Sequence, residues 1–321
     1  MPLNIALIFP GQGAQKVGMG LEFFQNSPQA KAVFEEADRI CANNLTKVVF
    51  EGPEDKLTST AYSQPAIFTV SVAALEAFKA HPKFKNYDVK FTAGHSLGEY
   101  AALYAAGVMP FDEALRLVQK RASCMEEAAR ENQGAMAAVI GFEPSKLVEI
   151  CRRTGAEIAN FNSNEQIVIT GHKAKVEAAM EEIKAAGGQK IIPLTVSGAF
   201  HSSLMASAAS KFAEALKEIS FSPSQVPVLS NVTGLPHSSN PANLVSSVVI
   251  PAQAGIQDNL ARQITSSVQW VKCVEYMASQ GIKNFIEIGP GKVLKGLIRR
   301  IDPALTVSNI EKPQDIEALA L

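Results

Sequence analysis

VKFTAGHSLG, at residues 89–98, is the stretch that decides the fold of this chain. It joins a short apolar run to the pattern Gly-x-Ser-x-Gly, and an alanine-rich segment follows directly. Between a strand and a helix, this pattern is typical of a nucleophile elbow, a sharp turn that needs glycine where backbones pack closely. The elbow would expose Ser96 at a helix N-terminus above a parallel sheet. A plain turn containing Gly and Ser is the alternative interpretation.

Strands and helices alternate on both sides of the elbow. The apolar run at 3–9 ends at Pro10-Gly11-Gln12-Gly13, which predicts a buried strand followed by a glycine-rich loop. Further strands are expected at 89–93, 226–230 and 284–288, and helices at 28–43, 65–80, 97–106, 111–130, 203–218, 257–265 and 270–280. Strands that alternate with helices favour a sheet of parallel strands.

The rhythm changes between residues 127 and 195. Strands are predicted at 135–140, 157–161, 166–170 and 190–194, and helices at 144–153 and 173–186. This βαββαβ order is typical of a ferredoxin-like unit. We therefore expect an α/β fold with two domains. Residues 1–126 and 196–321 would form a hydrolase-like three-layer domain with a parallel sheet, and residues 127–195 an inserted ferredoxin-like small domain.

The composition excludes several classes of protein. The 321 residues include 30 Lys plus Arg against 31 Asp plus Glu, and 47% are hydrophobic. This argues against nucleic-acid binding and against disorder. No run approaches the ~18 apolar residues of a membrane span, and the N-terminus does not resemble a signal peptide, so we expect a cytoplasmic protein without membrane contact. The cysteines are widely spaced, which predicts neither disulfides nor a metal site: Cys41, Cys124, Cys151 and Cys273.

A serine nucleophile needs a base, and the histidines are the candidates. The chain has five: His81, His95, His172, His201 and His237. We expect His81, His172 and His237 to be ordinary surface residues. His95, beside Ser96, would point away from it and support the elbow. His201, in a loop after the last strand of the small domain, is the best candidate for the base.

Arg121 is a charge in an unexpected place. On the helix predicted at 111–130 it lies within the apolar stripe formed by Ala114, Val118, Met125 and Ala128. No acidic residue lies one turn away from it, so a buried guanidinium must find an anion on another element or in a ligand. A structural salt bridge is one interpretation, and a fork for a substrate carboxylate is the other.

The segment 237–257 has no clear period. It is rich in Ser, Asn and Pro around an apolar core at 245–250, and we interpret it as a surface loop or flap.

Five motifs together resemble the malonyl-CoA:acyl carrier protein transacylases. They are GQGAQ (11–15), GHSLGEY (94–100), the helix that carries Arg121, GAFHS (198–202) and VQW (268–270), and they occur in the family's order over nearly the whole chain. The resemblance implies the architecture expected above. It also implies that malonyl-CoA and an acyl carrier protein are the partners. We expect a monomer that uses neither a metal nor a cofactor.

The resemblance also implies a role for each site residue. Ser96 would attack the malonyl thioester, and His201 would take its proton. The backbone N–H groups of Gln12 and Leu97 would form the oxyanion hole, and Arg121 would hold the malonyl carboxylate. The carrier's phosphopantetheine thiol would then attack the malonyl-serine ester, supplying extender units for fatty acid synthesis.

Three further residues are assigned to the pocket or to the orientation of the base. In this family a backbone carbonyl near the position of Gln269 orients the histidine, so a Ser–His dyad without a catalytic Asp is expected. His95 would support the site. Phe200 resembles the residue found in malonyl-selective acyltransferase domains of modular synthases, where a bulky ring would disfavour branched acyl groups. The segment 237–257 does not match the family and resembles an insertion.

A basic helix after Gly289-Pro290-Gly291 is a candidate docking face for an acidic carrier. Its cations are Lys292, Lys295, Arg299 and Arg300. An ordinary solvated helix face is the alternative. Two other functions remain open at this point: a serine hydrolase or esterase, which would need an acid behind the histidine and no carboxylate fork, and a non-catalytic scaffold that binds the carrier.

Overall fold

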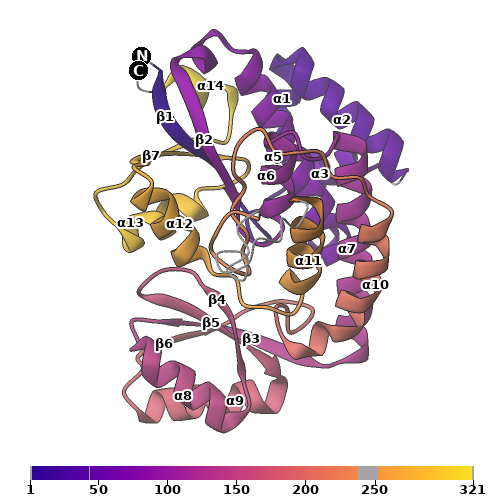
Figure 1. Ribbon diagram of the computed structural model, residues 1–321. Coiled ribbons are helices and arrows are strands. Elements are labelled where there is room, and N and C mark those ends of the chain that lie inside the picture. The colour runs from indigo at the N-terminus through magenta and orange to yellow at the C-terminus, as the bar shows by residue number, and fades with distance from the viewer. Residues whose placement is uncertain (1, 43, 238–251, 320–321) are drawn as a thin grey trace.

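A parallel four-stranded sheet is the centre of the larger part of the molecule (Figure 1). The computed structural model describes residues 2–42, 44–237 and 252–319. The strands lie in the order β2-β1-β7-β8, with bounds Tyr87–Gly94, Leu3–Phe9, Asn284–Ile288 and Thr306–Ile310. All neighbours are parallel. Strand β1 is buried from Ile5 onward, because helices cover both faces of the sheet.

The helices around this sheet include three that position the site. They are α5 (Thr60–Ala80), α6 (Gly98–Ala105) and α7 (Phe111–Glu131). The other helical elements are α1 (Leu21–Asn26), α2 (Pro28–Cys41), α3 (Leu45–Glu51), α4 (Glu54–Thr58), η1 (Pro82–Asn86), η2 (Ser203–Met205), α10 (Ala206–Lys217), α11 (Ala252–Gln263), α12 (Trp270–Ser279), α13 (Val293–Ile301) and α14 (Pro313–Glu317).

A second, antiparallel sheet forms from the middle of the chain. Its order is β4-β5-β3-β6, with bounds Glu157–Phe161, Gln166–His172, Gly134–Ile140 and Lys190–Pro193. Helices α8 (Pro144–Thr154) and α9 (Lys173–Ala185) cover its outer face, away from the rest of the molecule (Figure 1). The helices and this sheet share an apolar core of their own, separate from the two clusters around the parallel sheet.

Strand β4 links the two sheets. The backbone N–H of Phe161 donates to the carbonyl of Val268 at 2.9 Å, and Val268 donates to Ala159 at 2.8 Å. The segment before α12 therefore holds the antiparallel sheet against the parallel one. A cavity lies where the two parts meet, and residues from both line it.

The elbow between β2 and α6 is strained and tightly packed. Ser96 has φ = 49°, a left-handed conformation that is rare for residues other than glycine. A Cβ at Gly94 would lie 1.8 Å from the carbonyl carbon of Gly98, and one at Gly98 would lie 2.1 Å from the carbonyl oxygen of Phe9. Both glycines are therefore required by close backbone approach, as the sequence pattern predicted.

Some expected elements differ from the structure. The strand expected at 226–230 is wrong: the described backbone there makes only isolated bridges, from Val228 to Thr92 and from Leu229 to Pro236. Proline has no N–H to donate, so Pro227 and Pro236 cannot extend a ladder. Strand β8 and the short helices α1, α3, α4 and α14 were not expected. Most of the segment 237–257 lies outside the described residues, but α11 already begins at 252.

The packing of the elbow generates a paired prediction on stability. Gly98→Ala should lower the free energy of unfolding by about 3 kcal/mol or more, because backbone atoms cannot make room for the new methyl group. Gly296→Ala, in the exposed part of α13 with nothing within 4 Å of the new Cβ, should raise it by about 0.5–1 kcal/mol. Urea denaturation of both variants measures the difference. Equal effects would contradict the assigned packing.

Candidate active site

The cavity between the two sheets has a volume of about 570 Å³ and contains the predicted nucleophile, base and arginine. Ser96 comes from the elbow, Arg121 from the middle of α7, and His201 from the loop before η2. The glycine-rich loop at 11–13 and residues of the antiparallel sheet also line the cavity. Three residues that lie far apart in the sequence are therefore brought to one site.

Ser96 and His201 form a hydrogen-bonded pair. The Oγ of Ser96 lies 2.8 Å from Nε2 of His201, and Nδ1 of His201 lies 2.8 Å from the carbonyl oxygen of Gln263. Because a carbonyl only accepts, the ring proton is on Nδ1, and Nε2 is free to accept the serine proton. His201 also has a left-handed backbone, with φ = 57°. The pair has the geometry of a nucleophile and its general base.

Burial and a neighbouring cation keep His201 neutral. The side chain is enclosed, and this desolvation together with the charge of Arg121 lowers the pKa of His201 to about 3. The hydrogen bond to the Gln263 carbonyl acts in the opposite direction but is weaker. A neutral imidazole at ordinary pH is the form that accepts a proton.

The carbonyl that orients His201 belongs to Gln263, and the expectation of Gln269 was wrong. Gln263 is the last residue of α11, where carbonyl groups have no partner within the helix. The carbonyl of Gln269 instead accepts from the N–H of Cys273 at the start of α12. A helix C-terminus also carries partial negative charge, which favours the protonated imidazole that forms during the reaction.

Arg121 is buried, with 1% of its surface exposed, and it contacts only neutral acceptors. Its Nη1 donates to Oε1 of Gln64 at 2.8 Å, and its Nη2 donates to Oε1 of Gln263 and to Oγ of Ser96, both at 3.0 Å. The ring of Tyr100 lies 5.5 Å from Cζ. Burial lowers the pKa of Arg121, and Tyr100 and Glu99 oppose that shift.

No carboxylate within the described ranges lies within ion-pair distance of Arg121. The structural salt bridge, one of the two interpretations of this residue, is therefore absent from the described part of the chain. A guanidinium has five N–H donors, so Arg121 keeps donors for an anionic ligand beside the nucleophile.

The two residues expected to supply oxyanion donors lie beside the nucleophile or in the cavity lining. Gln12 lines the cavity, and Leu97 follows the nucleophile at the N-terminus of α6. Neither N–H is bonded to a protein acceptor among the residues with described positions. A Cβ at Gly11 would lie 2.4 Å from the carbonyl oxygen of His95, so the loop packs directly against the elbow.

His95 and Phe200 both line the cavity. Nε2 of His95 lies 2.7 Å from Oδ1 of Asn162 in the loop after β4, and its ring packs edge-on against Trp270. The ring is therefore held between the loop after β4 and the first residue of α12. Burial lowers the pKa of His95. Phe200 is 94% buried beside His201, and its carbonyl accepts from Oγ1 of Thr170.

His237 is a buried residue, and the expectation that it lies on the surface was wrong. It is 5% exposed, and Nε2 lies 2.8 Å from Oε1 of Glu99, which is fully buried. The polar neighbours of His237 in the sequence gave no sign of this contact. His172 is exposed and His81 is half-buried, paired with Glu317.

The four cations of the predicted docking face are exposed at α13. Lys292, Lys295, Arg299 and Arg300 make no ion pair with any described carboxylate. The same helix places Val293, Leu294 and Leu297 in the cavity wall. The helix that carries these cations therefore also contributes to the cavity wall.

The described residues offer neither a metal site nor a membrane-spanning helix. No group of three or more His, Cys, Asp or Glu side chains there is arranged to hold a metal ion. All four cysteines are free and buried. None of the described helices is both long enough and apolar enough to span a membrane.

Comparison with known proteins places this site in a family. The acyl transferase domain matches residues 6–309. A malonyl CoA-acyl carrier protein transacylase of Bacillus subtilis is 40% identical over 98% of this chain and 95% of its own length. One from Escherichia coli O157:H7 is 40% identical over 98% of both chains. The chain belongs to the malonyl CoA-acyl carrier protein transacylase family.

Solved members of the transacylase family share the α/β fold with its parallel sheet. An acyl-carrier-protein-S-malonyltransferase from Bartonella henselae has a TM-score of 0.89 at 37% identity, covering 98% of both chains. A malonyl-transacylase in complex with a type II PKS acyl-carrier protein has a TM-score of 0.89 at 35% identity, again covering 98% of both chains.

The pKa of His201 generates a prediction on pH dependence. Because the reaction needs neutral His201, its rate is lost only as the pH falls through the pKa, which lies well below the ordinary value of 6.5. The apparent second-order rate constant for acylation of Ser96 by malonyl-CoA should therefore stay nearly constant between about pH 8 and pH 5. Quenched-flow intact mass spectrometry measures it. A rate that is halved near pH 6.5 would contradict the low pKa.

Proposed function

We propose that this protein transfers a malonyl group from malonyl-CoA to the phosphopantetheine thiol of an acyl carrier protein. The observation that carries the proposal is the buried guanidinium of Arg121, which touches the Ser96 nucleophile and has no carboxylate partner among the described residues. A malonyl thioester supplies both missing parts: a carbonyl for Ser96 and a carboxylate for Arg121. The product would supply extender units for fatty acid synthesis.

The reaction proceeds in two matched halves. In the first, His201 Nε2 takes the proton of Ser96 while Oγ bonds to the thioester carbonyl carbon. The C–S bond then breaks, and the protonated His201 returns the proton to the leaving thiolate of coenzyme A. In the second, His201 takes the proton of the carrier's thiol, whose sulfur attacks the serine ester. The C–O bond breaks, and Ser96 regains its proton. The scheme is ping-pong and needs no cofactor.

The backbone N–H groups of Gln12 and Leu97 stabilise the oxyanion in both halves. Both are available in the described structure, and the residue after the nucleophile is the usual donor on such elbows. A donor of this kind contributes about 10²–10³-fold in rate. The N-terminus of α6 adds partial positive charge at the same place.

Arg121 gives the site its selectivity. A hydrogen bond to a charged group contributes about 1.5–3 kcal/mol, and an acetyl group would leave those donors unpaired. Phe200 limits the space beside His201, which disfavours branched acyl groups. Malonyl transfer therefore exceeds acetyl transfer.

Two alternative functions fit the geometry less well. A serine hydrolase would place an acid behind the histidine, but His201 faces the carbonyl of Gln263. A scaffold without activity would not keep Ser96 and His201 within 2.8 Å in catalytic geometry.

The strand orders support our division of the chain into two domains. We assign residues 1–126 and 196–321 to a hydrolase-like domain, because a parallel sheet carries a nucleophile elbow there. We assign residues 127–195 to a ferredoxin-like domain, because βαββαβ gives the antiparallel order β4-β5-β3-β6. A monomer acting in the cytoplasm remains our prediction for the assembly.

Removal of the guanidinium tests the proposed function. Arg121→Ala should lower the rate of malonyl transfer to a carrier by about tenfold to a hundredfold, because the lost charged hydrogen bonds contribute ~1.5–3 kcal/mol. Acetyl transfer should be kept or increased. Radiolabel transfer from each acyl-CoA measures both rates, and Ser96→Ala, which removes the attacking oxygen, provides the blank. An Arg121→Ala enzyme that still prefers malonyl-CoA over acetyl-CoA would contradict the assignment of Arg121 as the group that binds the malonyl carboxylate.

The basic surface of α13 is our proposed docking site for the carrier, which is acidic in this family. The charge reversals Lys295→Glu and Arg299→Glu together should slow transfer to the carrier by about tenfold at low salt, because electrostatic steering is lost. Acylation of Ser96 by malonyl-CoA should not change. Lys184→Glu, an exposed cation on α9, is the matched control. If the double variant and the Lys184→Glu control slow transfer to the carrier by the same factor, the surface has no specific role.

A further inference from the structure

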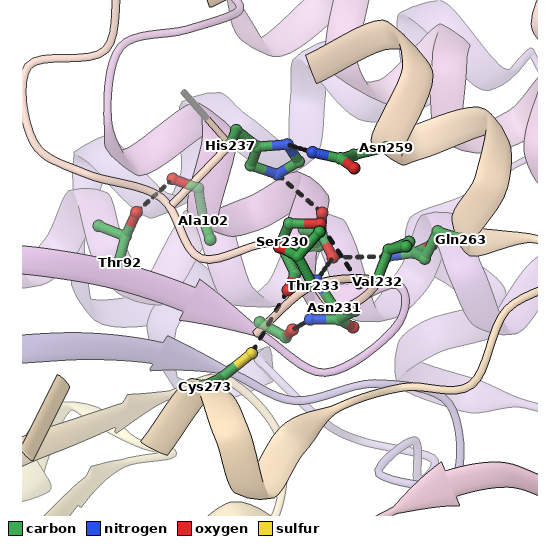
Figure 2. A network of polar contacts seen from close by, with 12 residues as sticks. Thr92, Ala102, Ser230, Asn231, Val232, Thr233, His237, Asn259, Gln263 and Cys273 are labelled. Carbon is green, nitrogen blue, oxygen red and sulfur yellow. Dashed lines mark hydrogen bonds and ion pairs between the residues drawn. The ribbon is translucent and has the colours of Figure 1, made fainter. Parts of the chain in front are cut away.

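The pair formed by Glu99 and His237 lies behind the site and takes no part in the mechanism above. Glu99 is in the first turn of α6, three residues after the nucleophile, and its side chain is fully buried. Nε2 of His237, the last residue of the described range 44–237, lies 2.8 Å from Oε1 of Glu99. Figure 2 shows the His237 ring beside Asn259. A buried carboxylate is costly unless polar groups surround it, so its contacts indicate what it holds in place.

The two carboxylate oxygens of Glu99 contact different groups. Oε2 accepts from the backbone N–H of Asn231 at 2.9 Å and from Nε2 of Gln263 at 2.7 Å. Oε1 lies 2.8 Å from Nε2 of His237. Nδ2 of Asn259 lies 3.4 Å from Nδ1 of His237, and as a donor to Nδ1 it leaves the ring proton on Nε2, which faces Glu99. His237 therefore lies at ion-pair distance from Oε1, without a hydrogen bond of normal geometry, while Oε2 accepts from Gln263.

The side-chain amide of Gln263 connects this carboxylate to Arg121. Its Nε2 donates to Glu99 and, at 3.0 Å, to the carbonyl of Ser96, while its Oε1 accepts from Arg121. A reversed amide would point its oxygen at a carboxylate and a carbonyl, and its N–H groups at a guanidinium. Glu99 thus decides which end of the amide Arg121 meets.

Separation by an amide also keeps the guanidinium available. A carboxylate in direct contact with Arg121 would occupy the donors that the substrate needs. Glu99 acts on Arg121 through one intervening amide and through its charge, which favours the protonated guanidinium. The geometry points to Glu99 and His237 as positioning residues that orient Gln263, and through it Arg121, for recognition of an acyl carboxylate. This inference rests on the proposed malonyl transfer.

The test compares malonyl-CoA with acetyl-CoA as acyl donors in the same variant. Glu99→Gln keeps the shape of the side chain but removes the charge that fixes the Gln263 amide. The ratio of the second-order rate constants for Ser96 acylation, malonyl over acetyl, should fall by about tenfold, the loss expected for one charged hydrogen bond. General damage to the elbow lowers both rates equally and leaves the ratio unchanged. A ratio that stays the same or rises would overturn the assignment.

Variants of His237 provide a second, independent measurement. His237→Phe removes the group that faces Glu99 and should lower the ratio, whereas His237→Gln offers an N–H donor and should restore part of it. Cys273→Ala is the matched control: Sγ of Cys273 is buried and bonds to the carbonyl of Ser230 in the same region (Figure 2). It should lower the thermal midpoint without changing the ratio. Equal ratios in His237→Phe and His237→Gln would contradict a positioning role.

A double-mutant cycle separates this inference from the proposed function. If Glu99 acts through Arg121, Glu99→Gln should not lower the ratio further in an Arg121→Ala background. An additional fall there would overturn the proposed route. If the unaltered protein fails to transfer malonyl at all, the proposed function is wrong. If it transfers malonyl and Glu99→Gln leaves the ratio unchanged, only the positioning role is wrong.

Discussion

The buried guanidinium of Arg121 is the interaction on which the site depends. A cation removed from water must be stabilised by neighbouring groups, and here they are two amide oxygens, a serine hydroxyl and an aromatic ring. In the transfer that we propose, an incoming carboxylate adds to this stabilisation. Selectivity for an acidic acyl group would then follow from the unpaired charge, because a neutral acyl group gains none of that stabilisation.

The left-handed backbone conformation of Ser96 is a second constraint on the site. Its left-handed φ is maintained because surrounding groups hold both sides of the elbow. Asn231 accepts from the N–H of Ser96 with its Oδ1 at 2.6 Å and donates from Nδ2 to the carbonyl of Gly94 at 2.7 Å. Glu99 in turn holds the backbone of Asn231. The same buried carboxylate therefore supports both the nucleophile and, through Gln263, the substrate fork.

Site residues could be predicted from the sequence where their immediate neighbours in the chain indicate their role. Ser96 was predicted because its glycines are next to it, and Arg121 because a charge interrupted a helical stripe. The roles of Gln263, Glu99 and His237 were not predicted, since they arise only where these three residues, far apart in the sequence, come into contact. Glu99 lies in the first turn of α6, where an acidic residue is common whatever its function. The expected carbonyl near Gln269 came from the family resemblance, and the structure places Gln263 there instead.

His201 is oriented by a neutral backbone carbonyl, that of Gln263, and this arrangement suits the anionic substrate that we propose. An aspartate at that position would put a second negative charge close to Arg121 and would repel the malonyl carboxylate. The C-terminal carbonyl of α11 fixes the same tautomer and stabilises the imidazolium with a partial charge only. The full negative charge of Glu99 is set one amide further away, on the opposite side of Gln263. Gln263 therefore has two functions in the mechanism that we propose. Its backbone carbonyl orients His201 without adding a carboxylate, and its side-chain amide separates the carboxylate of Glu99 from the guanidinium of Arg121.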